Sequence, residues 1–191
     1  MLFRSQDLKE QTDEELLRRS REGNVAAFGE LVRRNESKVA ATVVGMLGKC
    51  DEADDIGQET FIRFHGALEK FRGDSSIGTY ITRIAINLSL NELRRRERRR
   101  FLFRTIDPGN DPEEPLAERT VDRFEEEEII RRALESLSPN FRAIITLRLI
   151  EGYSTEETAE ILQIPLGTVL SRLRRAQQKL RIILNNYKEG F

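Results

Sequence analysis

Apolar residues recur at steps of three and four along most of the chain, which is the spacing of one face of an α-helix. Alternation with a period of two, which predicts strands, is missing. One long helix is predicted from Asn24 to about Gly48. Its apolar stripe consists of Val25, Phe28, Leu31, Val32, Val39, Val43 and Leu47. The pattern therefore predicts an all-α protein built from several amphipathic helices.

Capping residues and breaks mark further helices in the first half of the chain. Thr12 and Glu15 form a capping box at the start of a helix that ends before residue 23. A helix is predicted over residues 51–71, and after a break at 72–76 the next one runs from 77 to about 100. One face of the first of these two helices gathers Asp54, Asp55, Gln58 and Glu59.

The last third of the chain predicts a helix-turn-helix. Ser138 is a candidate N-cap with Pro139 at the first helical position, and Ser154 with Glu157 forms a second capping box. Residues 163–165 break the short helix that follows, and a new helix begins. The residues predicted to face inward in these two helices are Ala159, Leu162, Val169, Leu173, Ala176 and Leu180. In this motif the second helix is free to enter the major groove of DNA.

Charged residues are segregated along the chain, although their sum is close to zero. The 191 residues include 32 Lys and Arg against 33 Asp and Glu, a formal net charge of -1. Residues 91–104 carry a net charge of +5, residues 107–128 carry -8, and residues 165–181 hold five basic residues and no acid. Clustered Lys and Arg release counterions from phosphates. Two basic segments with an acidic one between them therefore predict two contacts with a polyanion.

Composition disfavours several classes of protein. With one cysteine, Cys50, and one histidine, His65, the chain cannot form an internal disulfide or a Cys/His zinc site, and a catalytic triad could use only these two. No stretch approaches the roughly 18 consecutive apolar residues of a membrane span, and the N-terminus lacks the apolar core of a signal peptide. We expect a soluble cytoplasmic protein without catalytic residues, metal or cofactor.

Candidate nucleic-acid contacts lie on both basic helices. Arg174 and Arg175 are the best candidates for guanine or phosphate contacts, and Thr168 and Ser171 lie near the helix start, where phosphate contact is expected. Over residues 71–100, rings, hydroxyls and amides precede the arginines, a mixture that suits single-stranded DNA. These residues are Phe71, Ser75, Ser76, Tyr80, Asn87 and Asn91. From the residues alone, core packing is the preferred interpretation of the two rings.

Four motifs, in this order, resemble the signature of the extracytoplasmic-function sigma factors of the sigma-70 family. They are DDIGQETF at 54–61, FRGDSS at 71–76, RIAIN at 83–87 and GTVLSRLRRA at 167–176. The resemblance covers about Asn24 to Leu184. It implies two small helical domains, the region 2 bundle and the region 4 helix-turn-helix, joined by an acidic flexible linker. We expect boundaries of 1–102, 103–121 and 122–191, because prolines and glycine stand among acids in the linker.

The resemblance implies a promoter-specificity subunit of bacterial RNA polymerase. The face with Asp54, Asp55, Gln58 and Glu59 is implied to dock on the clamp helices of the largest polymerase subunit. Recognition and melting of the -10 element are implied for Phe71, Arg72, Ser75, Ser76, Tyr80, Arg83, Asn87, Asn91, Arg94 and Arg95. Recognition of the -35 element is implied for Thr168, Ser171, Arg172, Arg174, Arg175, Gln178 and Lys179. Other implied partners are the polymerase flap and an anti-sigma factor, often membrane-anchored.

Three other interpretations stay open. A sigma-like mimic that titrates an anti-sigma factor should lose the basic reading helix, whose basic residues this chain keeps. A dimeric helix-turn-helix repressor would leave the acidic face at 54–59 unexplained, and an enzyme would need a convergent acid and base set. Gly57, His65 and Leu170 depart from the family pattern, and Leu170 occupies a place often held by Lys or Arg.

Overall fold

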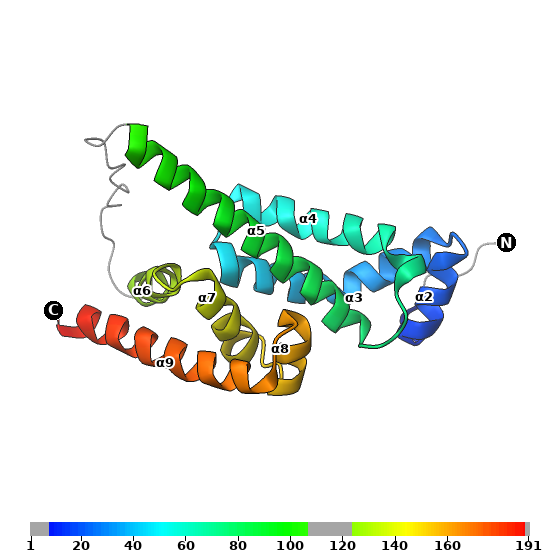
Figure 1. The fold of residues 1–191 in the computed structure, drawn as a ribbon. Helices are drawn as coiled ribbons and strands as arrows, with labels where there is room; N and C mark the ends of the chain where they lie inside the picture. The colour runs from blue at the N-terminus through cyan, green and yellow to red at the C-terminus, as the bar shows by residue number, and fades with distance from the viewer. Residues whose placement is uncertain (1–7, 107–123, 190–191) are drawn as a thin grey trace.

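The regular elements of the chain are helical throughout the part that the structure describes. A computed structural model describes residues 8–106 and 124–189, and Figure 1 shows the arrangement of the helices. The predicted all-α fold is therefore confirmed. Most of the predicted linker, residues 107–121, lies outside the described residues.

Local capping explains the first two long helices. The Thr12 hydroxyl accepts a hydrogen bond from the Glu15 amide and begins α2 (Asp13–Arg21). The Glu15 carboxylate binds Arg18 and Arg19 instead of returning to Thr12, so only half of the predicted capping box forms. Next, the Asn24 side chain caps α3 (Val25–Leu47) by accepting from an amide at 3.1 Å. The structure confirms the predicted start and end of this helix.

The following helix is shorter than predicted. The α4 helix (Asp51–Gly66) ends five residues before Phe71, and a 3₁₀ turn, η1 (Leu68–Lys70), follows. The reason is a tertiary contact, because the Arg21 guanidinium on α2 donates to the carbonyl oxygens of Leu68 and Phe71. These carbonyls are thus satisfied without a continuing helix. The next helix, α5 (Ile77–Ile106), instead runs six residues beyond its predicted end.

The C-terminal part contains the predicted helix-turn-helix. It consists of α6 (Phe124–Glu135), α7 (Pro139–Ile145), a π-helical turn η2 (Thr146–Ile150), α8 (Thr155–Leu162) and α9 (Leu166–Glu189). Both halves of the Ser154–Glu157 capping box are present. Gln163 ends α8 in the left-handed region, with φ of 52°. Thr158 and Ile161 are the buried residues of α8, whereas the predicted inward residues Ala159 and Leu162 are half-buried.

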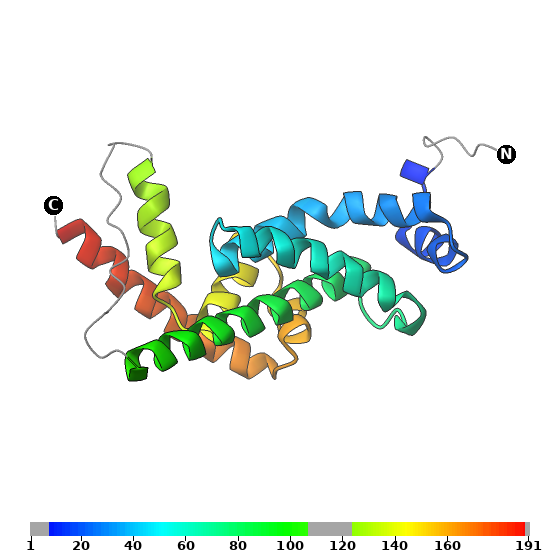
Figure 2. The ribbon, with the colours of Figure 1, turned by 90° about the horizontal axis from the view of Figure 1, so that it is seen from above.

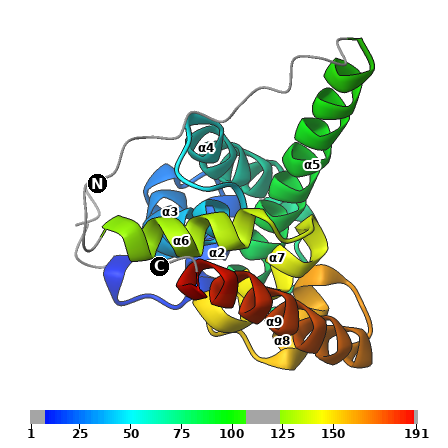
Figure 3. The ribbon, with the colours of Figure 1, turned by 90° about the vertical axis from the view of Figure 1, so that its left-hand side faces the viewer.

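Apolar packing joins these helices into two clusters. Figure 2 shows α3, α4 and α5 side by side, and Figure 1 shows α7 and α8 against this layer. The main core takes in Phe64 and Ile81 from this layer together with Leu147 and Ile161 from the C-terminal part. A smaller core lies between α6, α7 and α9, and Figure 3 shows α6 beside α9.

Candidate polymerase and nucleic-acid interfaces

The acidic face of α4 is exposed, as helical spacing predicts. Asp54, Asp55 and Gln58 are exposed, and the Glu59 side chain is 41% exposed and binds Arg63 at 2.7 Å. The opposite side of the helix is held in the core by Ala53, Thr60 and Phe64. This burial fixes the direction in which the four polar side chains point.

The same face of α4 carries an apolar residue that the sequence analysis missed. Ile62 is 65% exposed, and it lies three and seven positions after Glu59 and Asp55, so it shares their side of the helix. A protein partner could therefore bury an apolar side chain at the centre of a charged rim, as protein interfaces commonly do. The signal available in the sequence was the position of this isoleucine, at helical spacing from Asp55 and Glu59.

Residues 72–76 form the loop that leads into α5. Arg72 and Ser76 are exposed and Ser75 is half-buried, while Gly73 has a φ of 81° that favours glycine. The Ser76 hydroxyl accepts a hydrogen bond from the Thr79 amide at 3.0 Å. Ser76 therefore caps α5 in addition to any contact with a ligand.

The two aromatic candidates pack against each other. Phe71 is 7% exposed, and its ring meets that of the half-buried Tyr80 edge-on, with 4.9 Å between centroids. Tyr80 also lies 6.3 Å from the ring of Phe64. Both rings therefore pack in or against the core, and part of the Tyr80 ring remains exposed to solvent.

Polar candidates on α5 line one exposed stripe. Asn87 and Asn91 are one turn apart and exposed, and exposed Arg94 donates to the Asn91 amide oxygen at 3.3 Å. Arg95 binds the buried carboxylate of Glu92 at 2.7 Å, and this hydrogen bond holds the pKa of Glu92 below its usual value. The stripe thus combines amides with fixed guanidinium groups, the combination that suits an opened strand.

Arg83 is set apart from that stripe. Its guanidinium binds the carboxylate of Glu160 on α8 at 3.0 Å, and its side chain is 22% exposed. Its Nε is buried without a hydrogen-bond partner among the described residues. The structure therefore covers one predicted -10 contact with part of the helix-turn-helix.

The α9 helix presents its basic candidates to solvent. Ser171, Arg174, Arg175, Gln178 and Lys179 are exposed, and Thr168 and Arg172 are half-buried. Val169 and Ala176 are buried on the opposite side. Lys179 lies 5.2 Å from the centroid of the Phe141 ring, which orients its ammonium group along α7.

The three residues that depart from the family pattern have distinct surroundings. Gly57 is half-buried on α4, and a Cβ atom built there would meet no neighbour within 4 Å. His65 is exposed, with its ring edge-on to Phe28 at 4.8 Å between centroids. Leu170 is 51% exposed on the outer side of α9.

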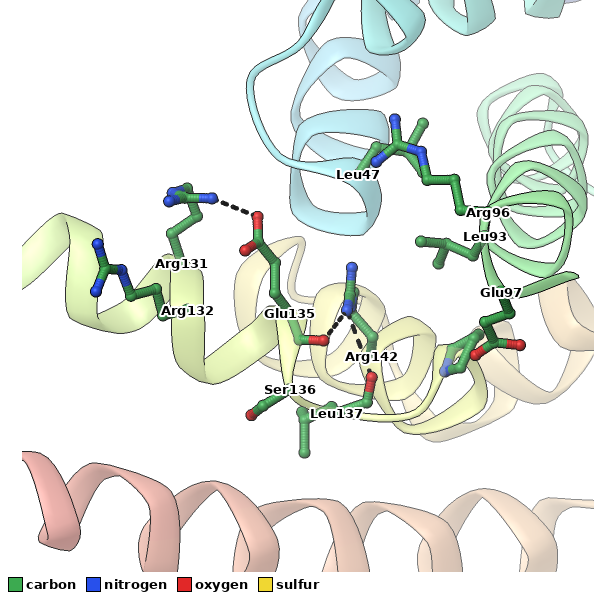
Figure 4. Close-up of a pocket in the computed structure, with 11 residues that line it drawn as sticks. Leu47, Leu93, Arg96, Glu97, Arg131, Arg132, Glu135, Ser136, Leu137 and Arg142 are labelled. Carbon is green, nitrogen blue, oxygen red and sulfur yellow. Dashed lines mark hydrogen bonds and ion pairs between the residues drawn. The ribbon is translucent and has the colours of Figure 1, made fainter. Parts of the chain in front are cut away.

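A cavity of about 530 Å³ lies between the end of α3, residues 93–97 of α5 and the α6–α7 corner (Figure 4). Arg131 binds Glu135 there, and Arg142 donates to the carbonyl oxygens of Glu135 and Leu137.

Among the described residues, no three His, Cys, Asp or Glu side chains come together as a metal site. Nor is any described helix both long enough and apolar enough to cross a membrane.

Comparison with protein families finds two matches along the chain. Residues 31–99 match the model of Sigma-70 region 2, and residues 127–180 match that of Sigma-70, region 4. The RNA polymerase sigma-H factor of Pseudomonas aeruginosa is 35% identical over 183 residues, which cover 91% of this chain and 94% of that protein. The ECF RNA polymerase sigma-E factor of Escherichia coli K12 is 36% identical over 177 residues, which cover 88% of this chain and 92% of that protein.

Two solved structures are similar in fold. A chain in the structure of CnrH in complex with the cytosolic domain of CnrY aligns with a TM-score of 0.66 and 26% identity, covering 91% of this chain and 97% of that one. A chain in the structure of the sigma factor RpoE in complex with the anti-sigma factor NepR from Bartonella quintana aligns with a TM-score of 0.65 and 24% identity. The alignment covers 84% of this chain and 98% of that one. The second likeness concerns the fold alone.

Proposed function

Since the chain belongs to the extracytoplasmic-function sigma factors of the sigma-70 family, we propose how its parts divide the recognition of a promoter. A sigma factor directs RNA polymerase to promoters and is not an enzyme. The region 2 module, residues 1–102, binds the polymerase core and opens the -10 element. The region 4 module, residues 122–191, reads the -35 element. Residues 103–121 connect them, although α5 continues to Ile106.

One observation carries this proposal. The chain exposes an amide-and-arginine stripe on α5 and a basic face on α9, each backed by buried apolar residues. A separate acidic face on α4 supplies a surface for protein. A sigma-like mimic needs only surfaces for protein partners, so two preserved basic faces favour a factor that contacts DNA.

The polymerase core is the proposed partner of α4. The clamp helices of the polymerase dock on Asp54, Asp55, Gln58 and Glu59, and the flap of the polymerase binds the region 4 module. Exposed carboxylates attract a basic partner and suppress wrong ones, because like charges brought together at an interface repel. The cytoplasm, where polymerase works, is the proposed location.

An anti-sigma factor is a further proposed partner. The RpoE chain of similar fold is bound to the anti-sigma factor NepR, and CnrH is bound to the cytosolic domain of CnrY. A partner of this kind would hold the factor inactive until a signal releases it. We propose no metal or cofactor for this chain.

Replacing Asn87 with Ala is expected to impair opening of the -10 element more than binding to duplex DNA. The exposed amide is placed to bond the edge of an unstacked base, which exists only once the strands separate. The test is transcription from a duplex template and from the same template with a pre-melted bubble. The bubble should restore transcription by the variant.

Asn140 supplies the control, because it is an exposed asparagine on α7, outside the stripe of amides and arginines on α5. Asn140→Ala should transcribe both templates as the unchanged protein does. An equal deficit of Asn87→Ala on both templates would mean that the amide has no part in melting.

Replacing Arg175 with Ala is expected to reduce discrimination between the proper -35 element and scrambled DNA by about 1–3 kcal/mol, the value of one bidentate contact to guanine. Its guanidinium is exposed on α9. The measurement is the affinity of the holoenzyme for both DNAs at one salt concentration. Arg181→Ala, an exposed arginine on the same helix, is the matched control and should keep the discrimination. Equal losses on both DNAs would identify Arg175 as a phosphate contact.

A further inference from the structure

The loop at residues 72–76, to which we assign contact with the -10 element, is held at its start by a different helix. Arg21 is the last residue of α2. Its Nε donates to the carbonyl oxygen of Leu68 at 2.9 Å, and its Nη2 donates to the carbonyl oxygen of Phe71. The nitrogens of a guanidinium group have a fixed planar arrangement. One side chain therefore fixes both the turn η1 and the residue that precedes the loop.

The side chain of Phe71 is fixed as well as its carbonyl group. The residue is 7% exposed, and its ring meets the Tyr80 ring edge-on at 4.9 Å between centroids. The three residues that follow, Arg72, Gly73 and Asp74, are exposed. The chain therefore leaves the core at a point that is fixed through both its backbone and its ring.

The far end of the loop is fixed by α3 and by a helix cap. The Ser76 hydroxyl accepts a hydrogen bond from the Thr79 amide at 3.0 Å. A Cβ atom added to Gly78 would lie 3.3 Å from the Oδ1 atom of Asn35, so the start of α5 packs closely on α3. Asn35 is 7% exposed, and its Nδ2 donates to the Leu31 carbonyl oxygen at 2.8 Å. This hydrogen bond fixes the direction of the Asn35 oxygen, so both ends of the loop are anchored.

Anchored ends matter for binding because ordering a flexible loop costs free energy when a ligand binds. Among these anchors, Arg21 differs from Phe71 in its burial. Arg21 is exposed, whereas Phe71 belongs to the main core. Removing the Arg21 side chain should therefore release the start of the loop without opening a cavity in the core.

From these contacts we propose that Arg21 is a positioning residue for recognition of the -10 element. Its guanidinium holds the start of the loop, so that Arg72 and Ser75 meet the opened strand in one arrangement. Arg21 acts through the two carbonyl groups that it binds and not on the DNA. The inference rests on the proposed function of the loop at 72–76.

Binding of single-stranded oligonucleotides to the holoenzyme tests the proposal. One oligonucleotide carries the -10 sequence selected from a randomised promoter library, and the other carries the same bases in scrambled order. The ratio of the two affinities measures selectivity. Arg21→Ala should lower this ratio about tenfold, the factor that corresponds to the loss of one hydrogen bond to a charged group. Its affinity for the scrambled oligonucleotide should stay the same, and an unchanged ratio would refute the proposal.

Arg21→Lys separates the hold on the loop from an effect of charge. The lysine keeps the positive charge, but its compact ammonium group lacks the planar fork that reaches two carbonyl oxygens. The selectivity ratio of this variant should therefore stay below that of the unchanged chain. Full recovery with lysine would mean that the charge alone is sufficient, which contradicts a positioning role.

Arg18→Ala is the matched control, because Arg18 is an exposed arginine one turn earlier on α2. Its guanidinium binds Glu15 and Glu22 on the same helix. This variant should keep the selectivity ratio. Urea unfolding should give similar midpoints for the Arg18 and Arg21 variants. A marked loss of stability in Arg21→Ala alone would identify a purely structural residue and overturn the proposal.

A variant in the loop itself separates this inference from the proposed function. Arg72→Ala combined with Ser75→Ala removes two side chains that we assign to the -10 element. If this double variant keeps the selectivity ratio, the loop does not read the -10 element and the proposed function fails. If the double variant loses the ratio while Arg21→Ala keeps it, only the positioning role of Arg21 is refuted.

Discussion

Charge reversal at both Asp55 and Glu59 is expected to weaken binding to RNA polymerase core by at least about a hundredfold. Like charges brought together at an interface cost several kcal/mol, and about 1.4 kcal/mol corresponds to each factor of ten. Asp55 is exposed and Glu59 is 41% exposed, so both carboxylates are available to a partner. Fluorescence titration of labelled protein with core enzyme measures the effect.

Reversal of two other acids is the matched control for net charge. Glu14 and Glu36 are exposed on α2 and α3, and neither belongs to the acidic face of α4. The doubly reversed variant at these positions should bind core as the unchanged protein does. If both double variants lose affinity equally, the clamp assignment gives way to a general effect of charge.

Truncation of Phe64 to Ala is expected to destabilise the folded protein by about 3–5 kcal/mol, the range observed for buried aromatic residues. Phe64 is fully buried, and its ring stacks on Phe28 at 5.9 Å and meets Tyr80 at 6.3 Å between centroids. The ring therefore joins α3, α4 and α5, and its removal leaves a cavity at their junction. Urea unfolding followed by circular dichroism measures the loss.

Phe101 provides the matched control for this substitution. Its side chain is 71% exposed near the end of α5, so Phe101→Ala removes the same atoms from a surface position. A loss of at most about 0.5 kcal/mol is expected there. Equal losses for the two variants would mean that the core does not depend on Phe64 as the packing indicates.

Local signals in the sequence predicted most helix boundaries. Asn24 and Ser154 cap their helices with side chains only three residues from the amides they bind, so the sequence contains the whole interaction. The end of α4 was predicted wrongly, because the Arg21 guanidinium that satisfies the Leu68 carbonyl comes from 47 residues away. Spacing within one helix cannot reveal such a partner.

For the candidate sites too, the sequence predicted features set within one helix and missed contacts between distant parts of the chain. Helical spacing placed Asp55 and Arg175 on faces away from the apolar stripes, and both are exposed in the structure. The sequence could not show that Glu160 covers Arg83, because that contact joins two modules. Nor did it separate the packing of Phe71 from a role in binding, since an aromatic ring suits both.

Run-off transcription with core polymerase on a randomised promoter library tests the central claim most directly, because it requires both modules at one start site. We predict initiation at defined positions from templates that share one -10 and one -35 sequence, with loss of the transcript when either element is scrambled. Failure to initiate from any template, by a chain that still sequesters an anti-sigma factor, would contradict the account and identify a mimic.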